Sequence, residues 1–242
     1  MPVLDLKNCT ILLKDGYRDT SGLVNFMAGY SIGATSMAVD GFTVAPPVGS
    51  TFTIEAGTQR YVVLTSTTTL ITFTPGLAGA VADNDNITVG GRQIEAKLGD
   101  GNLTYSKTKN REYILNRGVI DEVRNGDEAP IDVSLNAQWQ FITGHSSDPG
   151  GGLPTIEDVL DNVGLASSWI SSDLDDPCRP YCIDIEIVNE PVCDTVQGEY
   201  VLLKHFRYEK LDHDAKAGSI ATTGKCNIQT PVVTRFDQTP SL

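Results

Sequence analysis

Apolar and polar residues alternate along several stretches of the chain, and a spacing of two predicts half-buried β-strands. The longest alternating stretch is Ile131–Phe141. Its apolar set is Ile131, Val133, Leu135, Ala137, Trp139 and Phe141, and its polar set is Asp132, Ser134, Asn136, Gln138 and Gln140. Antiparallel sheets that face a core on one side and water on the other produce this pattern. We therefore expect an antiparallel β protein in which this strand exposes a wholly polar face.

Further strands are predicted where shorter apolar runs lie between turn residues. They are Ile11–Lys14, Ile94–Leu98, Tyr113–Leu115, Val119–Val123, Ile183–Ile187, Tyr200–Tyr208, Gly218–Thr222 and Asn227–Arg235. The turns Asp100-Gly101-Asn102 and Asn125-Gly126-Asp127 supply the positive-φ residues that tight hairpins need. The chain is therefore expected to be β almost throughout.

One helix is predicted near residues 155–163, after the Gly150-Gly151-Gly152 run. Its apolar residues lie at helical spacing, at Ile156, Val159, Leu160 and Val163. Thr155 and Asp158 fit a capping box, and Gly164 stands where a glycine often ends a helix. A helix this short needs tertiary packing, so we expect it to flank the sheet.

Residues 31–89 differ in amino-acid composition and in hydrophobic pattern from the rest of the chain. This stretch is rich in Thr, Val, Ala and Gly, and it has no helical period. Short runs at Thr51–Glu55, Tyr61–Thr65 and Leu70–Thr74 lie between Gly, Pro and Thr-rich turns, which predicts short strands. The expected fold is a mainly β, antiparallel β-sandwich or barrel scaffold, made of residues 1–30 and 90–242, with an inserted small β domain at 31–89.

The charge and the hydropathy of the chain argue against two classes of function, nucleic-acid binding and insertion into a membrane. The 242 residues carry a formal net charge of −13, which argues against binding nucleic acid by phosphate neutralisation. An acidic wall would instead repel phosphates, as suits a conduit through which DNA slides, although many acidic proteins have no such role. No stretch has the ~20 apolar residues that span a bilayer, and the N-terminus lacks the features of a signal peptide. We therefore expect no membrane partner.

The candidate chemical motifs are weak. Gly29-Tyr30-Ser31-Ile32-Gly33 matches the nucleophile-elbow pattern, but no helical stripe follows Ser31, and we interpret the glycines as a hinge into the insert. Cys178, Cys182, Cys193 and Cys226 are interpreted first as free thiols, then as disulfides formed after release, then as metal ligands. The sequence predicts a protein that is not an enzyme, with no catalytic, cofactor-binding or metal-binding residue.

Several segments resemble tail tube (major tail) proteins of long-tailed bacteriophages. They are TILLKDG (10–16), GRQIEAKLGDGNLTYSKTKNREYILNRGVIDEVRNGDEAPIDVSLNAQWQFI (91–142), PTIEDVLDN (154–162), DPCRPYCIDIEI (176–187), HFRYEKLDHDAKAGSIATTGKCNI (205–228) and TPVVTRF (230–236). The likeness covers nearly all of the chain outside the insert, and the segments follow the same order. The insert, with its phrase TFTPGLAGAVADNDNITV, resembles a small β module that recurs in virion proteins.

The resemblance implies a structural virion protein, assembled in the host cytoplasm, whose hexameric rings stack into the hollow tail tube. DNA would pass through the lumen only as transient cargo during ejection. Other partners would be the tape measure, terminator, baseplate or tip proteins, and a sheath where the tail has one. The polar residues of Ile131–Phe141 would face the lumen, and their strand would pair with a neighbouring subunit. Lys107, Lys109 and Arg111 would lie in a loop that contacts the adjacent ring, with Asp173, Asp175 and Asp176 as its acidic partners.

Two other functions stay open. A decoration or adhesion protein would use the inserted domain to bind a receptor or a carbohydrate. A tube protein of a contractile secretion device would share the same architecture. The helix and the long polar-faced strand favour the phage tail tube.

Overall fold

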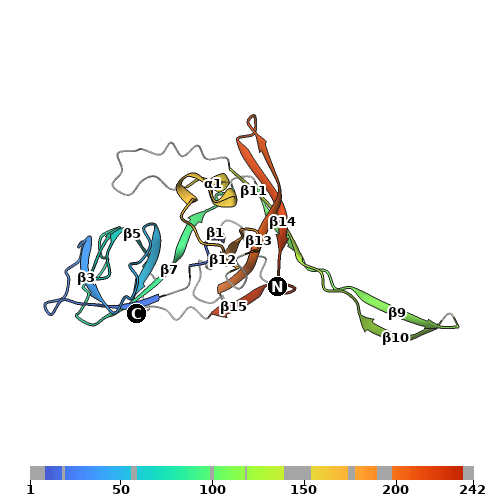
Figure 1. Cartoon of the computed structure of the whole chain (residues 1–242), viewed down its shortest axis with the longest axis horizontal. Coiled ribbons are helices and arrows are strands. Elements are labelled where there is room, and N and C mark those ends of the chain that lie inside the picture. Colours follow the sequence, from blue (N-terminus) through green and yellow to red (C-terminus); the bar gives the residue numbers. More distant parts are fainter. Residues whose placement is uncertain are drawn as a thin grey trace. The chain divides into compact units, whose positions relative to one another are not determined.

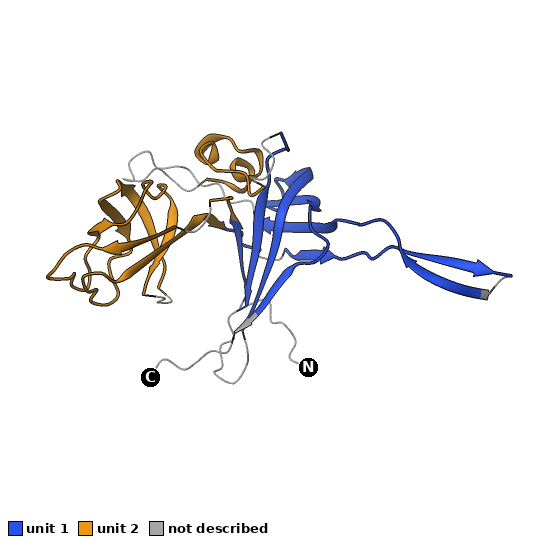
Figure 2. Cartoon of the chain, turned by 60° about the horizontal axis from the view of Figure 1, so that its bottom comes forward, with its two compact units in different colours: residues 1–13, 95–140, 175–242 blue, residues 14–94, 141–174 orange. Residues whose placement is uncertain are grey.

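The computed structural model describes residues 9–17, 20–55, 59–98, 101–117, 119–138, 154–173, 178–189 and 198–236. It confirms a mainly β fold, with 54% strand and 5% helix. The chain forms two compact units, which Figure 2 colours separately. Unit 1 contains Met1–Leu13, Glu95–Gln140 and Asp175–Leu242, and unit 2 contains Lys14–Ile94 and Phe141–Leu174.

Unit 2 contains a closed six-strand barrel, seen in part in Figure 1. Its strands are β2 (Thr20–Val24), β3 (Ser36–Asp40), β4 (Ser50–Ile54), β5 (Tyr61–Ser66), β6 (Leu70–Thr74) and β7 (Asn86–Glu95). They pair in the order β2-β3-β6-β5-β4-β7, and β2 also pairs with β7. This last pairing closes the barrel, and closure removes the open edges that would otherwise attract other strands.

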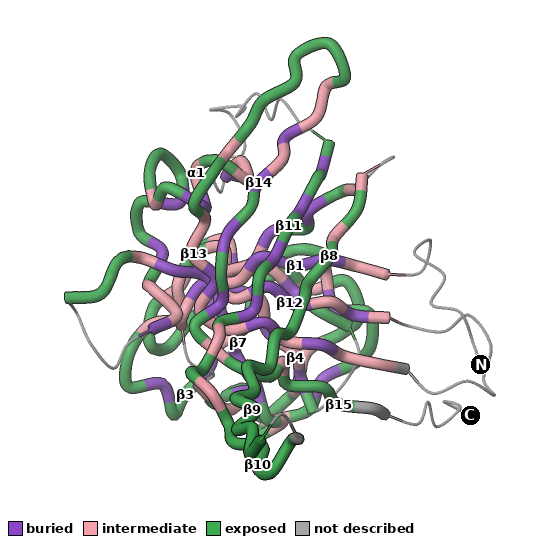
Figure 3. Tube along the Cα trace, turned by 90° about the vertical axis from the view of Figure 1, so that its right-hand side faces the viewer, coloured by how far each residue is buried: buried purple, intermediate pink, exposed green. Residues whose placement is uncertain are grey.

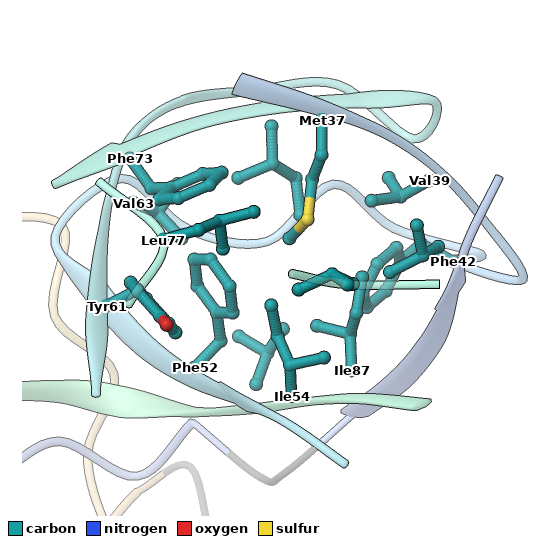
Figure 4. Close-up of a cluster of buried hydrophobic side chains, with 14 residues drawn as sticks. Met37, Val39, Phe42, Phe52, Ile54, Tyr61, Val63, Phe73, Leu77 and Ile87 are labelled. Carbon is teal, nitrogen blue, oxygen red and sulfur yellow. The ribbon is translucent and has the colours of Figure 1, made fainter. Parts of the chain in front are cut away.

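The barrel interior is filled by side chains (Figure 4). Inward-facing positions alternate along each strand, as in β4, where Ser50, Phe52 and Ile54 are buried. Phe52, Tyr61 and Phe73 form the aromatic centre, with ring centroids 5.2–5.4 Å apart. The Tyr61 hydroxyl accepts a hydrogen bond from the Ala78 amide (3.2 Å), so its polar end is satisfied. The interior of the barrel is therefore a packed hydrophobic core.

The barrel extends beyond the predicted insert at 31–89. β2 (Thr20–Val24) lies before the expected start, yet it pairs with both β3 and β7. The strand β7 continues past Val89 to Glu95 without interruption. The barrel needs a sixth strand to close, and the chain that leads into the insert supplies it as β2. The sequence TSGLV is too short and too polar to predict a strand by itself.

The predicted helix is present as α1 (Ile156–Asp161), in unit 2. Its capping box is confirmed, with the Thr155 side chain accepting from the Asp158 amide and Asp158 accepting from Thr155. The predicted end at Gly164 is wrong, because Asn162 takes the left-handed conformation and ends the helix two residues earlier. Gly164 instead begins a short 3₁₀ turn, Gly164–Ala166.

Unit 1 contains a twisted antiparallel sheet. Its strands pair in the order β1-β12-β13-β14-β11-β8, and β15 pairs with β13. Their bounds are β1 (Cys9–Lys14), β8 (Leu103–Ser106), β11 (Ile131–Gln138), β12 (Ile183–Asn189), β13 (Gly198–Asp214), β14 (Ser219–Cys226) and β15 (Val232–Phe236). Between β8 and β11 the chain extends outward as a two-stranded ribbon of β9 (Arg111–Asn116) and β10 (Val119–Asn125) (Figure 1).

Most predicted strands are present, but the predicted strand Ile94–Leu98 shares only Ile94 and Glu95 with β7 (Asn86–Glu95), and three strands were missed altogether. The missed strands are β2, β3 and β8, which have four or five residues each. Glu186, a charged residue between Ile185 and Ile187 in β12, is also buried, with only 1% of its surface exposed. Both faces of β12 hold buried residues, so simple alternation does not describe this strand.

Candidate assembly surfaces

The long alternating strand has the two faces that the sequence predicts. In β11, Ile131, Val133, Leu135 and Ala137 are buried, while Asp132, Ser134, Asn136 and Gln138 are exposed. Gln140, the fifth residue of the predicted polar face, lies outside the described residues. The polar set is therefore one continuous exposed row over the described part of the strand.

β11 is an interior strand, so the expectation of an edge open to a neighbouring subunit is wrong. All of its residues pair with β14 on one side, and Asp132–Leu135 pair with β8 on the other. Beyond β8, the amides of Asn136 and Gln138 donate to the carbonyls of Asn102 and Lys97 (2.8 and 2.7 Å). The sequence could not show this, because β8 is a four-residue strand with no clear alternation.

The polar face continues across four strands of unit 1. Directly opposed residues in an antiparallel sheet point to the same side. The register therefore gives two rows: Ser106, Asp132, Lys225 and Arg207, and then Thr104, Ser134, Thr223 and Lys210. Charges of both signs lie on this face, with Lys225 3.6 Å from Glu209 and Lys210 2.6 Å from Asp212, and Lys225 also lies opposite Arg207. The face is thus polar, and its positive and negative charges nearly cancel.

The three cations predicted to contact another ring lie on the first limb of the β9–β10 ribbon, before its turn. Lys107 and Lys109 precede β9, and Arg111 begins it. The Lys107 ammonium donates to the Thr230 hydroxyl of the same unit (2.6 Å). All three residues are exposed. The prediction that Asp173 is an acidic partner of these cations is wrong, because Asp173 is only 5% exposed. The other two predicted partners, Asp175 and Asp176, lie outside the described residues.

The β9–β10 ribbon has one apolar side. The register pairs Tyr113 with Val123 and Leu115 with Ile120, which places these four side chains on one side of the ribbon. Each of them is 52–61% exposed. Figure 3 shows the ribbon as exposed wherever it is coloured by burial. We call these four residues the ribbon's apolar side.

The opposite side of the ribbon is charged. Glu112 pairs with Arg124 and Ile114 with Glu122, and the Arg124 guanidinium lies 2.8 Å from the Glu122 carboxylate. Ile114 is only 37% exposed among these charged groups. The ribbon is therefore amphipathic, although both of its sides face solvent in the isolated chain.

A second exposed apolar surface lies on the barrel, in the segment between β2 and β3. We call residues 25–35 the β2–β3 loop. Phe26, Met27 and Ile32 are exposed there, and 95% of the Met27 surface is accessible. The loop is held in place: the Phe26 amide donates to Asp83 Oδ1 (2.8 Å), and Tyr30 and Val81 exchange two backbone bonds (2.8 and 3.0 Å). The rings of Phe26 and Tyr30 pack 5.0 Å apart.

This loop also contains the nucleophile-elbow pattern. Gly29 and Gly33 both have positive φ, at 66° and 86°, and a Cβ on Gly29 would meet the Val81 carbonyl oxygen at 2.5 Å. After Ser31 the chain enters the strand β3, so the strand–turn–helix geometry that an elbow needs is not formed here. The glycines serve the turn, and Ser31 is exposed.

A buried ion pair fastens four segments of unit 2. Asp15 accepts from the Tyr17 and Arg92 amides (3.2 and 2.9 Å) and from Arg92 Nη1 (3.2 Å). Arg92 also donates to the carbonyls of Ser168 and Val48 (2.6 and 3.2 Å). Burial raises the pKa of the Asp15 carboxyl, and the hydrogen bonds and the Arg92 charge only partly offset this rise. The arrangement is structural, since both Asp15 carboxylate oxygens and the Nε and Nη1 groups of Arg92 are hydrogen-bonded within unit 2.

The cysteines divide by environment. Cys182 and Cys226 are buried in unit 1, whereas Cys178 is exposed, and Cys193 lies outside the described residues. No disulfide joins any two of the four described cysteines, Cys9, Cys178, Cys182 and Cys226. Burial, with Asp184 and Cys182 nearby, raises the pKa of Cys226 to about 12. Its thiol is therefore protonated and unreactive at neutral pH.

Comparisons of the chain with protein-family models, with curated proteins and with solved structures find no match. Across the described residues, every helix is too short or too polar to cross a bilayer. The function must therefore be argued from the surfaces themselves.

Proposed function

We propose that this chain is a structural subunit that assembles with copies of itself into stacked rings, forming the tail tube of a long-tailed bacteriophage. The observation that carries the proposal is the polar face of unit 1, which runs across β8, β11, β14 and β13 over a buried apolar face. A tube wall needs this division, with water on the lumen side and a core behind it.

The charge of the polar face fits a lumen. Its described residues carry charges of both signs, and Lys210 and Lys225 are each paired to a carboxylate, so the face is not a cationic surface of the kind that holds phosphates. The chain as a whole has a net charge of −13. A wall of this kind lets DNA slide past without binding it. Asp132, Ser134, Asn136, Gln138 and Gln140 are the lumen-facing residues in this proposal.

The exposed ribbon supports assembly. A two-stranded hairpin with large apolar side chains in water is marginal by itself, and exposed apolar patches mark sites of protein contact. In the proposed tube, the limb that carries Lys107, Lys109 and Arg111 contributes to contacts between rings. The hexameric state comes from the family resemblance.

The barrel supports a second candidate, a decoration or adhesion protein. It is closed, it has its own core, and it presents a rigid exposed loop, so it could bind a receptor or carbohydrate without help from unit 1. Such a protein would exist as single subunits or small oligomers.

Negative-stain microscopy of the purified protein separates the two. The tube proposal expects rings and hollow tubes with a lumen wide enough for duplex DNA. Discrete monomers or trimers at every concentration, with or without other virion proteins, would reject it in favour of the second candidate.

A further inference from the structure

We propose that the apolar side of the β9–β10 ribbon of one copy of this chain binds the β2–β3 loop on the barrel of a second copy. This inference rests on the proposed function, because it names one contact that holds the copies together. It assigns a role to two exposed apolar surfaces in the described part of the chain.

The ribbon supplies one half of the contact. Tyr113, Leu115, Ile120 and Val123 project from the same side, and the opposite side is charged. Both strands also keep an unpaired outer edge in the pairing of the described residues. Natural proteins seldom leave such a ribbon in water, because it invites association.

The barrel loop supplies the other half. Phe26, Met27 and Ile32 are exposed on a loop whose backbone is fixed to Val81 and Asp83. A surface that is rigid before binding loses little conformational entropy when it is covered. Aromatic and Met side chains on such a loop are typical of binding surfaces.

The charges favour a contact between a ribbon and a loop rather than a contact between two ribbons. Arg111 pairs with Asn125 on the apolar side of the ribbon, and none of the residues that the register pairs on that side is acidic. Two such sides together would leave the arginines without a carboxylate. The loop, by contrast, lies beside Asp83 and Asp85, whose carboxylates hold the Phe26 and Ala82 amides. The apolar and cationic side of the ribbon therefore matches an apolar and acidic surface.

The contact is heterologous, because each copy uses a different surface. Every copy then carries one ribbon and one loop, so the contact either repeats without limit or closes into a ring. This property gives the test, since blocking one surface per copy stops growth without destroying the other surface.

Two double variants block the surfaces. The ribbon variant is Leu115→Thr with Ile120→Thr, which keeps the strand propensity and removes apolar area. The loop variant is Met27→Lys with Ile32→Lys, which adds repulsion toward Arg111. Matched controls are Ile114→Thr on the charged side of the ribbon and Val44→Lys on another exposed barrel segment. Circular dichroism and thermal unfolding verify the fold of all four.

Analytical ultracentrifugation and microscopy give the result. We expect each double variant to stop at a smaller particle, a single subunit or a ring, with association at least tenfold weaker, while both controls assemble like wild type. An equimolar mixture of the two double variants should form pairs of these particles and nothing longer. Pair formation would also show that each variant retains one folded, working surface.

Other outcomes overturn the inference. If the loop variant assembles normally while the ribbon variant does not, the ribbon binds something other than this loop. If both variants form normal tubes, neither surface joins copies, and the proposed function survives without this contact. A wild-type chain that stays monomeric at all concentrations rejects both the contact and the proposed tube.

Discussion

The barrel of unit 2 and the β9–β10 ribbon of unit 1 are both antiparallel β-structure, yet they use their apolar residues in opposite ways. The barrel closes on itself and buries fourteen side chains in one cluster. The ribbon has two strands, no closure, and four large apolar side chains that remain more than half exposed. Strand propensity alone therefore does not make a β-structure stable. A strand also needs a second layer to pack against, and the ribbon has none within the described chain.

The largest expected effect tests the barrel side of this comparison. Phe52→Ala removes the ring that packs against both Tyr61 and Phe73, and it leaves a cavity in a closed core. We expect a loss of about 3–5 kcal/mol in the free energy of unfolding of the barrel. Tyr113→Ala in the ribbon should change stability by less than about 0.5 kcal/mol. Urea unfolding with hydrogen exchange measures both, and equal losses would contradict the comparison.

The next effect concerns the ion pair that fastens unit 2. Asp15→Ala leaves the Arg92 guanidinium, whose side chain is 13% exposed, without its carboxylate. We expect a loss of about 3–5 kcal/mol, because an unpaired buried charge is costly. Asp15→Asn should lose less, since its amide oxygen can still accept from the backbone. Urea unfolding of both variants at neutral pH measures the order, and an alanine variant as stable as the asparagine variant would contradict it.

A comparison of wild type with Asp15→Asn also predicts how stability changes with pH. The pKa of Asp15 is raised in the fold above its ordinary value of 3.8, so the folded chain holds this proton more tightly than the unfolded chain. The stabilisation from this group is complete below 3.8 and is lost as pH rises through the raised folded pKa. The stability of wild type relative to Asp15→Asn should therefore fall as pH rises through that window. A difference that is flat or rises with pH would contradict the raised pKa.

A smaller effect is expected in the unit 1 sheet. Thr222 in β14 is 2% exposed, and its hydroxyl oxygen has no hydrogen-bond partner among the described residues. Thr222→Val keeps the shape and removes the unsatisfied group, so stability should stay equal or rise by about 1 kcal/mol. Thr223→Val, on the exposed face of the same strand, is the matched control and should gain less. Differential scanning calorimetry measures both.

The smallest effect on folding is expected in the ribbon. Reversing its first-limb charges with Lys107→Glu, Lys109→Glu and Arg111→Glu should change the free energy of unfolding by less than about 0.5 kcal/mol, because all three residues are exposed. In the proposed tube the same change should suppress elongation, since each ring interface repeats the contact. Circular dichroism and sedimentation check the two halves of this prediction. Undiminished tubes from a well-folded triple variant would remove these cations from the ring contact.

The features that could be predicted from the sequence are those that depend on residues close together in the chain. The alternation in 131–138 correctly predicted which side chains are buried, because a strand places successive residues on opposite faces. The capping box at Thr155 and Asp158 correctly predicted the start of α1, since both bonds form within four residues. The mainly β class followed from the same local signals.

Only the tertiary structure decided which strands meet. Nothing in TSGLV shows that β2 pairs with both β3 and β7 and closes a barrel, and nothing in LTYS shows that β8 covers the edge of β11. These pairings join residues far apart in the chain, and short strands become stable only when their neighbours are already in place. The apolar side of the ribbon likewise depends on register, because the bulge between Ile120 and Glu122 decides which residues lie beside Tyr113 and Leu115.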